Sequence, residues 1–223
     1  METVRILSTK KLLPNQKQYL LNAGLSVLEA DFIGIEYTTF NLNTTSQNLL
    51  FTSQNAVKSF LENEESNKYK SQPVFCVGSK TKEAIETAGF KVIACTDYAS
   101  DLAGIITKDH SNESFAFFAG NLRKNTLPDA FAKAGIVFDE IRAYKTLLTP
   151  HKINSGIDGV LFYSPSGIES YLKENTITIE TCFCIGTTTA EALKGITKNI
   201  VIANKQTVEN VIIQCINYYK ESI

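Results

Sequence analysis

The chain has 223 residues, of which 43% are hydrophobic and 20% charged, a composition typical of a globular protein with one or two domains. Lys and Arg number 22 and Asp and Glu 23, so the net charge of −1 argues against a nucleic-acid or membrane-surface partner. No apolar run reaches the roughly 18 residues of a membrane span, and no secretory signal precedes the first apolar run. We therefore expect a cytoplasmic protein.

Short apolar runs recur along the chain and predict buried parallel strands. Helical stretches lie between them, most clearly at Thr207–Lys220, where apolar residues recur at helical spacing. Strands that alternate with helices indicate an α/β fold with parallel sheets and right-handed crossovers. The predicted strands are 4–7, 27–28, 48–51, 74–77, 92–95, 115–119, 160–163, 182–185 and 200–203.

Two segments break this alternation, Phe32–Phe40 and Asp139–Leu148. Both are rich in β-branched and aromatic residues, so we expect extended connectors rather than helices. If they pair with each other, the chain begins one lobe, crosses, completes the other lobe and crosses back. Two contiguous lobes divided near residue 110 are the alternative, and spacing alone does not choose between the two arrangements.

The sequence contains an internal repeat of about 110 residues. The segment Phe51–Leu61 recurs 111 residues later as Phe162–Leu172, and Phe75–Ala84 recurs 108 residues later as Phe183–Ala192. A third block, Ala23–Val27, recurs at 134–138. Three blocks in the same order indicate a tandem duplication.

Hydroxyl-bearing residues follow most of the predicted strands. At the N-terminus of a helix they supply hydroxyl and backbone N–H donors, which together form an anion site. Ser and Thr are also ordinary helix caps, so any one position alone indicates only a cap. Several at one edge of two sheets predict a cleft for a ligand with several anionic groups. They lie at Ser8–Lys10, Thr52–Asn55, Gly78–Thr81, Ser164–Gly167, Gly186–Thr189 and Gln206–Thr207.

Metal and nucleotide motifs are not evident. The five cysteines lie in apolar runs and have no partners at ligand spacing, so we expect buried thiols and no metal site. His110 and His151 lie in polar loops without a nucleophile at motif spacing. No dinucleotide or phosphate-loop glycine motif occurs, which disfavours a transferase with Rossmann-type lobes. We expect no cofactor.

The ordered set of strand-end motifs resembles the uroporphyrinogen-III synthase (HemD) family. The resemblance covers essentially the whole chain, including Tyr144 on the second connector. It rests on Phe51-Thr52-Ser53-x-x-Ala56-Val57, Val77-Gly78-x-x-Thr81, Phe162-Tyr163-Ser164-Pro165-Ser166-Gly167-Ile168 and Cys184-Ile185-Gly186-x-Thr188-Thr189-Ala190.

The resemblance implies two similar Rossmann- or flavodoxin-like parallel-sheet domains joined by a two-stranded antiparallel β-ladder. The first domain would be discontinuous, residues 1–33 with 150–223, and the second would span 41–138. The connecting strands would be 34–40 and 139–149. We expect a monomer.

The implied reaction is the cyclisation of hydroxymethylbilane, a linear tetrapyrrole with eight carboxylates, with loss of water and inversion of ring D. A non-catalytic two-lobe cytoplasmic protein that binds a small polyanion is the alternative from another class. Tyr171 and Tyr163 are candidate proton donors, because the family's tyrosine slot after the Ser-Pro-Ser-Gly turn is Ser170 here. The expected substrate-binding residues are Lys10, Thr52, Ser53, Asn55, Gly78, Thr81, Ser100, Arg123, Tyr144, Ser164, Ser166, Gly167, Thr187, Thr188 and Thr189.

Overall fold

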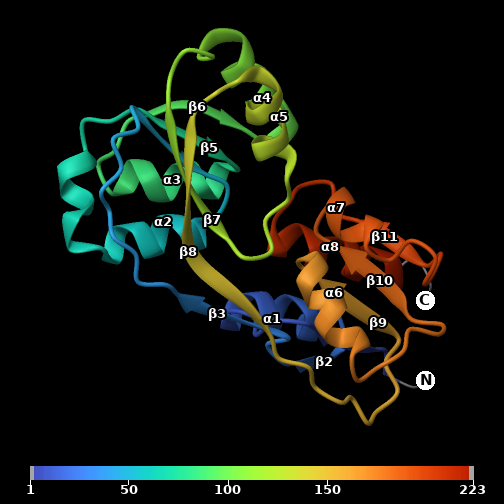
Figure 1. Cartoon of the computed structure of the whole chain (residues 1–223). Coiled ribbons are helices and arrows are strands. Elements are labelled where there is room, and N and C mark those ends of the chain that lie inside the picture. The colour runs from blue at the N-terminus through green and yellow to red at the C-terminus, as the bar shows by residue number, and fades with distance from the viewer. Residues whose placement is uncertain (1–2, 221–223) are drawn as a thin grey trace. The chain divides into compact units, whose positions relative to one another are not determined.

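The structure is a computed structural model that describes residues 3–220. The chain divides into two compact units, unit 1 with residues 1–34 and 147–223 and unit 2 with residues 35–146. It therefore begins in unit 1, builds the whole of unit 2 and returns to unit 1, as the colours of Figure 1 show.

Unit 1 contains a five-stranded sheet in the order β11-β10-β9-β1-β2, and every pair of neighbours is parallel. Strands β9 and β10 are buried along their whole length, as expected for a parallel sheet that is covered on both faces. The strands are β1 (Arg5–Ser8), β2 (Ser26–Glu29), β9 (Gly159–Phe162), β10 (Thr181–Cys184) and β11 (Ile200–Ile202), and the helices are α1 (Pro14–Asn22), α6 (Pro165–Leu172), α7 (Thr187–Glu191) and α8 (Val208–Lys220).

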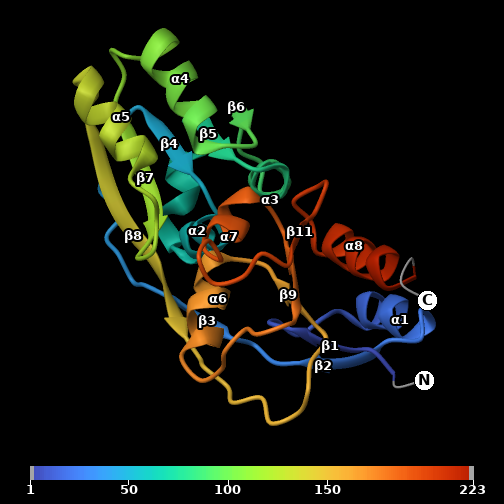
Figure 2. The same cartoon turned by 90° about the vertical axis from the view of Figure 1, so that its right-hand side faces the viewer.

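Helices cover both faces of this sheet. Leu20 of α1 and Val211 of α8 pack on Ile6 and Leu161 in one cluster, so α1 and α8 lie side by side on one face (Figure 2). Ile168 of α6 packs in a second cluster with strand residues that point to the other face. Two hydrophobic layers therefore enclose the strands.

Unit 2 contains a six-stranded sheet in the order β3-β8-β7-β4-β5-β6. The neighbours from β8 to β6 are parallel. The strands are β3 (Ile33–Tyr37), β4 (Asn48–Phe51), β5 (Val74–Val77), β6 (Val92–Thr96), β7 (Phe115–Gly120) and β8 (Phe138–Leu148), and the helices are α2 (Gln54–Glu62), α3 (Ser79–Thr87), α4 (Ala99–Asp109) and α5 (Thr126–Ala134), with a 3-10 turn, η1, at Glu64–Tyr69.

Strands β3 and β8 carry the chain between the units. Thr38 N–H donates to Ala143 O at 2.9 Å, and Thr149 N–H donates to Phe32 O at 3.0 Å. The residue numbers of the hydrogen-bonded partners fall along β8 as they rise along β3, so the two strands are antiparallel. The expected extended connectors are thus confirmed as strands, and β8 also pairs in parallel with β7, which makes it a full member of the sheet.

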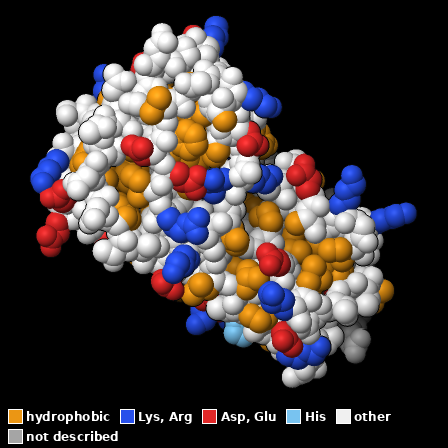
Figure 3. Space-filling view, viewed as in Figure 1, with side chains coloured by type: hydrophobic (Ala, Val, Ile, Leu, Met, Phe, Trp, Pro, Cys, Tyr) orange, Lys and Arg blue, Asp and Glu red, His pale blue; other side chains and the backbone are white. Residues whose placement is uncertain are grey.

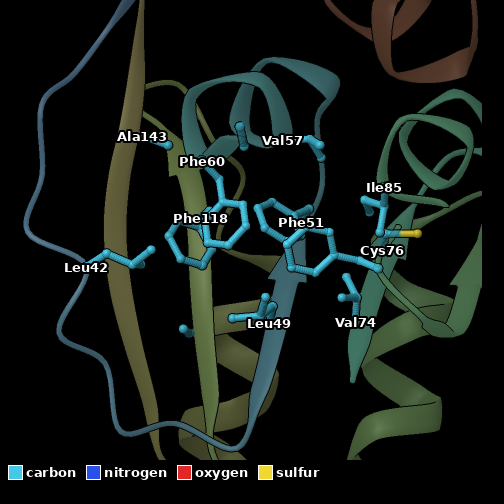
Figure 4. Close-up of a cluster of buried hydrophobic side chains, with 13 residues drawn as sticks. Leu42, Leu49, Phe51, Val57, Phe60, Val74, Cys76, Ile85, Phe118 and Ala143 are labelled. Atoms are coloured by element: carbon cyan, nitrogen blue, oxygen red, sulfur yellow. The ribbon is translucent and has the colours of Figure 1, made fainter. Parts of the chain in front are cut away.

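The core of unit 2 is rich in phenylalanine. Phe51 stacks on Phe118 with ring centroids 5.0 Å apart, and Phe60 of α2 meets both rings edge-on (Figure 4). Aromatic contacts of this kind add to the burial of apolar area. The cluster fixes α2 against β4 and so fixes the position of the turn between them.

The structure confirms the predicted α/β fold. All nine predicted strands are present within one or two residues of their expected ends, and the helix expected at 207–220 is α8. The duplication is also visible, since β11-β10-β9-β1-β2 of unit 1 corresponds in order and direction to β6-β5-β4-β7-β8 of unit 2. Gly24 and Gly135, equivalent in the repeat, both follow a helix with positive φ, +79° and +68°.

Candidate functional site

The central strands of unit 1 are β1 and β9, and the chain leaves them in opposite directions across the sheet. Ligands of open parallel sheets bind at such a switch point, beyond the carboxyl ends of the strands. There the Thr9 hydroxyl donates to Leu161 O at 2.7 Å, and the Ser8 hydroxyl donates to Lys10 O at 2.6 Å. These bonds hold the segment after β1 in a fixed position beside β9.

Tyr163 joins the segments that follow β1 and β9. Its hydroxyl lies 3.2 Å from Ser8 Oγ in a hydrogen bond, and the Lys10 Nζ lies 5.8 Å from the centre of its ring. Burial raises the pKa of Tyr163, so its phenol stays protonated in neutral solution. The exposed Lys10 ammonium is therefore held over an aromatic face at the switch point, where a carboxylate can reach it.

Ser164 caps α6. Its Oγ accepts from Gly167 N–H at 3.1 Å and lies 3.0 Å from Ser166 Oγ. A Cβ built on Gly167 would lie 3.6 Å from Thr9 Oγ1, which shows how closely α6 approaches the segment after β1. Two hydroxyls and the positive end of a helix thus converge on the unit 1 switch point.

The turn after β10 leads into α7, whose cap is Gly186 rather than a serine. Thr189 is 2% exposed, and its N–H donates to Gly186 O at 3.1 Å. Thr187 is exposed and Thr188 half-buried. Gln206 is not among the predicted substrate-binding residues. Its side chain packs against Gly186 and would lie 3.4 Å from a Cβ built on that glycine. The sequence placed Gln206 after the last strand, but only the structure shows this contact.

In unit 2 the equivalent central strands are β7 and β4. Ser53 caps α2, and its Oγ accepts from Asn55 N–H at 3.1 Å. Thr52 is half-buried at the end of β4. Gln54, another neighbour of the predicted set, donates from Nε2 to Lys80 O at 3.0 Å and so ties α2 to the start of α3.

The turn after β5 is built on Gly78, whose φ of +90° favours glycine. Its N–H donates to Thr96 O at 2.8 Å, and its O accepts from Thr81 N–H at 3.0 Å. Thr81 is 5% exposed. Ser100 is exposed on the first turn of α4, where its hydroxyl donates to Asp101 at 3.3 Å.

The segment after β7 carries two features that the sequence did not reveal. The Asn121 side chain makes two hydrogen bonds to the backbone of β8. Its Oδ1 accepts from Thr146 N–H at 2.7 Å, and its Nδ2 donates to Thr146 O at 3.3 Å. Arg123 forms a forked ion pair with Glu140, with Nε 2.8 Å from Oε1. Any carboxylate that binds Arg123 must therefore compete with Glu140.

Tyr171 is not at a strand end. It is 2% exposed, its ring centre lies 5.6 Å from those of Phe32 and Phe162, and burial raises its pKa to about 12. The neighbouring Ser170 is fully buried, and its Oγ has no hydrogen-bond partner among the described residues. Of the two candidate proton donors, Tyr163 is the one at the switch point.

A pocket of about 220 Å³ also lies in unit 2. Thr38, which lines this pocket, has a buried Oγ1 without a hydrogen-bond partner in the described part of the chain. None of the predicted substrate-binding residues lines this pocket, so it is separate from the strand-end motifs. Its lining is Tyr37, Thr38, Thr39, Phe40, Ser59, Glu62 and Asn63.

On the face drawn in Figure 3, Lys and Arg intermingle with Asp and Glu. Within residues 3–220, no three His, Cys, Asp or Glu side chains gather closely enough to hold a metal ion. In the same range no helix has the length and apolarity needed to cross a bilayer.

Fold and site together define a two-unit α/β protein whose parallel sheets present hydroxyl and N–H donors at their switch points. A family model described as uroporphyrinogen-III synthase HemD matches residues 16–213. The chain belongs to this family. A search of curated proteins finds no match.

Solved structures of this family share the fold. The uroporphyrinogen-III synthetase of Helicobacter pylori is 18% identical, with a TM-score of 0.72 over 97% of this chain and 100% of that one. A mutant uroporphyrinogen III synthase of Thermus thermophilus is 15% identical, with a TM-score of 0.72 over 99% and 100% of the two chains. At these identities the likeness shows the fold alone.

Proposed function

We propose that the chain is a uroporphyrinogen-III synthase, a hydro-lyase that cyclises hydroxymethylbilane with loss of water and inversion of ring D. The observation that carries this proposal is the family match over residues 16–213. The donor-rich strand ends support it, because a substrate with eight carboxylates needs many hydrogen-bond donors. Neutral hydroxyls and backbone N–H groups bind carboxylates without the desolvation cost of as many buried charges.

Each unit carries donors of its own at its strand ends, which we propose bind substrate carboxylates. In unit 1 these are the hydroxyls of Ser164 and Ser166, the N-terminus of α6 and the Lys10 ammonium. In unit 2 they are Thr52, Ser53 and the turn at Gly78.

The reaction itself asks mainly for positioning. The substrate loses hydroxide readily, and the enzyme must direct ring D to close through its substituted carbon, which gives a spiro intermediate. Holding the carboxylates in one geometry can favour that closure over simple cyclisation, because correct orientation lowers the barrier of one path only. Tyr163 is the candidate that can donate a proton to the departing hydroxide, since it lies at the switch point and stays protonated.

An assay of porphyrin isomers tests this function. Purified protein is mixed with fresh hydroxymethylbilane, the products are oxidised, and isomers I and III are separated by chromatography. We expect isomer III to predominate in proportion to the amount of protein. Isomer I alone, at the rate measured without protein, would exclude the proposed function even if the substrate binds, and would favour the non-catalytic polyanion-binding alternative.

A further inference from the structure

Two cysteines of unit 2 lie opposite each other on neighbouring strands. In the parallel pair of β5 and β6, Cys76 is the register partner of Cys95, and Phe75 is the partner of Ala94. Cys76 and Cys95 both pack on the cluster under α2 and α3, whereas Phe75 and Ala94 pack on the opposite face. The two thiols therefore project from the same face of the sheet, side by side.

This placement suits a disulfide. Neighbouring strands lie about 4.8 Å apart, and a disulfide needs Cα atoms roughly 4.4 to 6.8 Å apart. β6 is the edge strand of the sheet, so Cys95 can approach Cys76 without displacing another strand. Figure 4 shows the Cys76 sulfur at the margin of the phenylalanine cluster, directed away from Phe51. The bond can therefore close without repacking the aromatic core.

The thiols differ in exposure and already interact. Cys76 is fully buried, whereas Cys95 is partly exposed. Burial and the hydrogen-bonded neighbour Cys95 raise the pKa of Cys76 to about 12, so Cys76 stays a thiol in neutral solution. Cys95 is therefore the residue that an oxidant reaches first, and Cys76 is the resolving partner beside it.

We propose that Cys76 and Cys95 form a reversible disulfide, with a small-molecule disulfide such as oxidised glutathione as the oxidant. Cys95 gives its proton to solvent and its sulfur attacks one sulfur of oxidised glutathione. The glutathione S–S bond breaks, and one glutathione thiolate leaves and takes up a proton from solvent. Cys76 then gives its proton to solvent and attacks the Cys95 sulfur, which releases the second glutathione. Two protein thiols are oxidised, and one glutathione disulfide is reduced to two thiols.

The disulfide would act on a turn that the proposed function uses. Cys76 precedes Gly78 by two residues, Cys95 precedes Thr96, and Gly78 N–H donates to Thr96 O at 2.8 Å. A bond between Cys76 and Cys95, two residues before Gly78 on one strand and one residue before Thr96 on the other, changes the local strand spacing and so the position of the Gly78–Thr81 turn. This consequence rests on the proposed function, whereas formation of the disulfide does not.

The other three cysteines serve as internal controls. Cys182 and Cys184 are two residues apart on β10, so their Cα atoms lie about 6.6 Å apart, near the upper limit for a disulfide, and both are fully buried. Cys215 is buried on α8, in a different cluster from Cys182 and Cys184. We expect these three thiols to stay reduced under conditions that link Cys76 to Cys95.

Peptide mapping tests the proposal on the full chain. The protein is incubated with oxidised glutathione, remaining thiols are alkylated after denaturation, and a tryptic digest is analysed without reduction. We expect peptides 71–80 and 92–108 to be linked, and dithiothreitol to separate them. The Cys184→Ser variant should keep the link and the Cys95→Ser variant should lose it.

Three outcomes would overturn the proposal. They are glutathione retained on Cys95 with Cys76 alkylated, a link that involves Cys182, Cys184 or Cys215 in its place, and no oxidation at all. Because the link is read by mass, its failure is distinct from failure of the isomer assay. If the chain makes isomer III, we expect the linked protein to show a several-fold higher KM that returns to its starting value with dithiothreitol.

Discussion

Tyr144 lies directly across Gly120, its register partner at the end of β7. A Cβ on Gly120 would lie 2.5 Å from Tyr144 Cζ and 2.8 Å from its hydroxyl oxygen, well inside van der Waals contact. Only glycine leaves room for the ring at this position. The sequence indicated both residues as parts of a strand and a connector, but not that one makes space for the other.

We therefore expect Gly120→Ala to displace Tyr144 from the end of β7. Because the Cβ meets a ring packed on the unit 2 core, the free energy of unfolding should fall by about 1–3 kcal/mol, and synthase activity should fall as well. Urea unfolding and the isomer assay measure the two effects.

Gly104→Ala is the matched control. It lies on α4 with nothing within 4 Å of the added Cβ, and should raise stability by about 0.5–1 kcal/mol without changing activity. Equal stability of the Gly120 variant and wild type would contradict the close approach.

The Ser164 hydroxyl is expected to act both as a helix cap and as a substrate ligand. Ser164→Ala should therefore lower the free energy of unfolding by about 1 kcal/mol and raise KM for hydroxymethylbilane. Asn63→Ala removes a cap from η1 and the hydrogen bond that Asn63 Nδ2 donates to Phe40 O, both away from the strand ends, so it should lower stability by at least as much and leave KM unchanged. If both variants changed KM alike, the role of Ser164 would be structural only.

The two tyrosines should respond differently to loss of their hydroxyls. Tyr171 lies in the core of unit 1, so Tyr171→Phe should leave a largely active enzyme. A loss beyond about a hundredfold, roughly 2.7 kcal/mol, in a folded variant would show that this prediction is wrong. Tyr163→Phe removes the bond to Ser8 beside Lys10, and we expect the larger loss of kcat/KM there. Steady-state kinetics with circular dichroism as the folding control separates the two cases.

Stability should fall at alkaline pH. Burial raises the pKa of Cys184 to about 12, against an ordinary value of 9.0, so above pH 9 the unfolded chain releases a proton that the folded protein keeps. The stability that this group contributes is therefore fully present below pH 9 and is lost as pH rises, by about 1.4 kcal/mol at pH 10. Urea unfolding between pH 7 and 10 measures the slope. Cys184→Ala should show a shallower slope, and an unchanged slope would mean that the thiol titrates alike in both states.

Much of the fold follows from local patterns. The short apolar runs predicted nine strands, because a parallel strand that is buried on both faces is apolar along most of its length. The repeat placed Ser53 and Ser164 at equivalent positions, and both are helix caps in the structure. These features depend on residues close together in sequence, so the sequence alone reveals them.

Contacts between distant segments did not follow from the sequence. Three contacts depend on the register of β7 against β8. They are the Arg123–Glu140 ion pair, the hydrogen bonds between Asn121 and Thr146, and the close approach of Tyr144 to Gly120. Tyr163 differs from Tyr171 in the same way, since only the packing of α6 on the sheet shows which ring is in the core. Register and helix rotation are set by the whole core, which no single motif encodes.

The most direct test of the account asks whether the strand ends of both units bind the reaction product. Hydrogen–deuterium exchange of the protein with and without uroporphyrinogen III reads this segment by segment. We expect slower exchange at 52–55, 78–81, 164–167 and 187–189, with the pocket at 37–40 unchanged. Slower exchange at 37–40, with the four strand ends unaffected, would contradict the account.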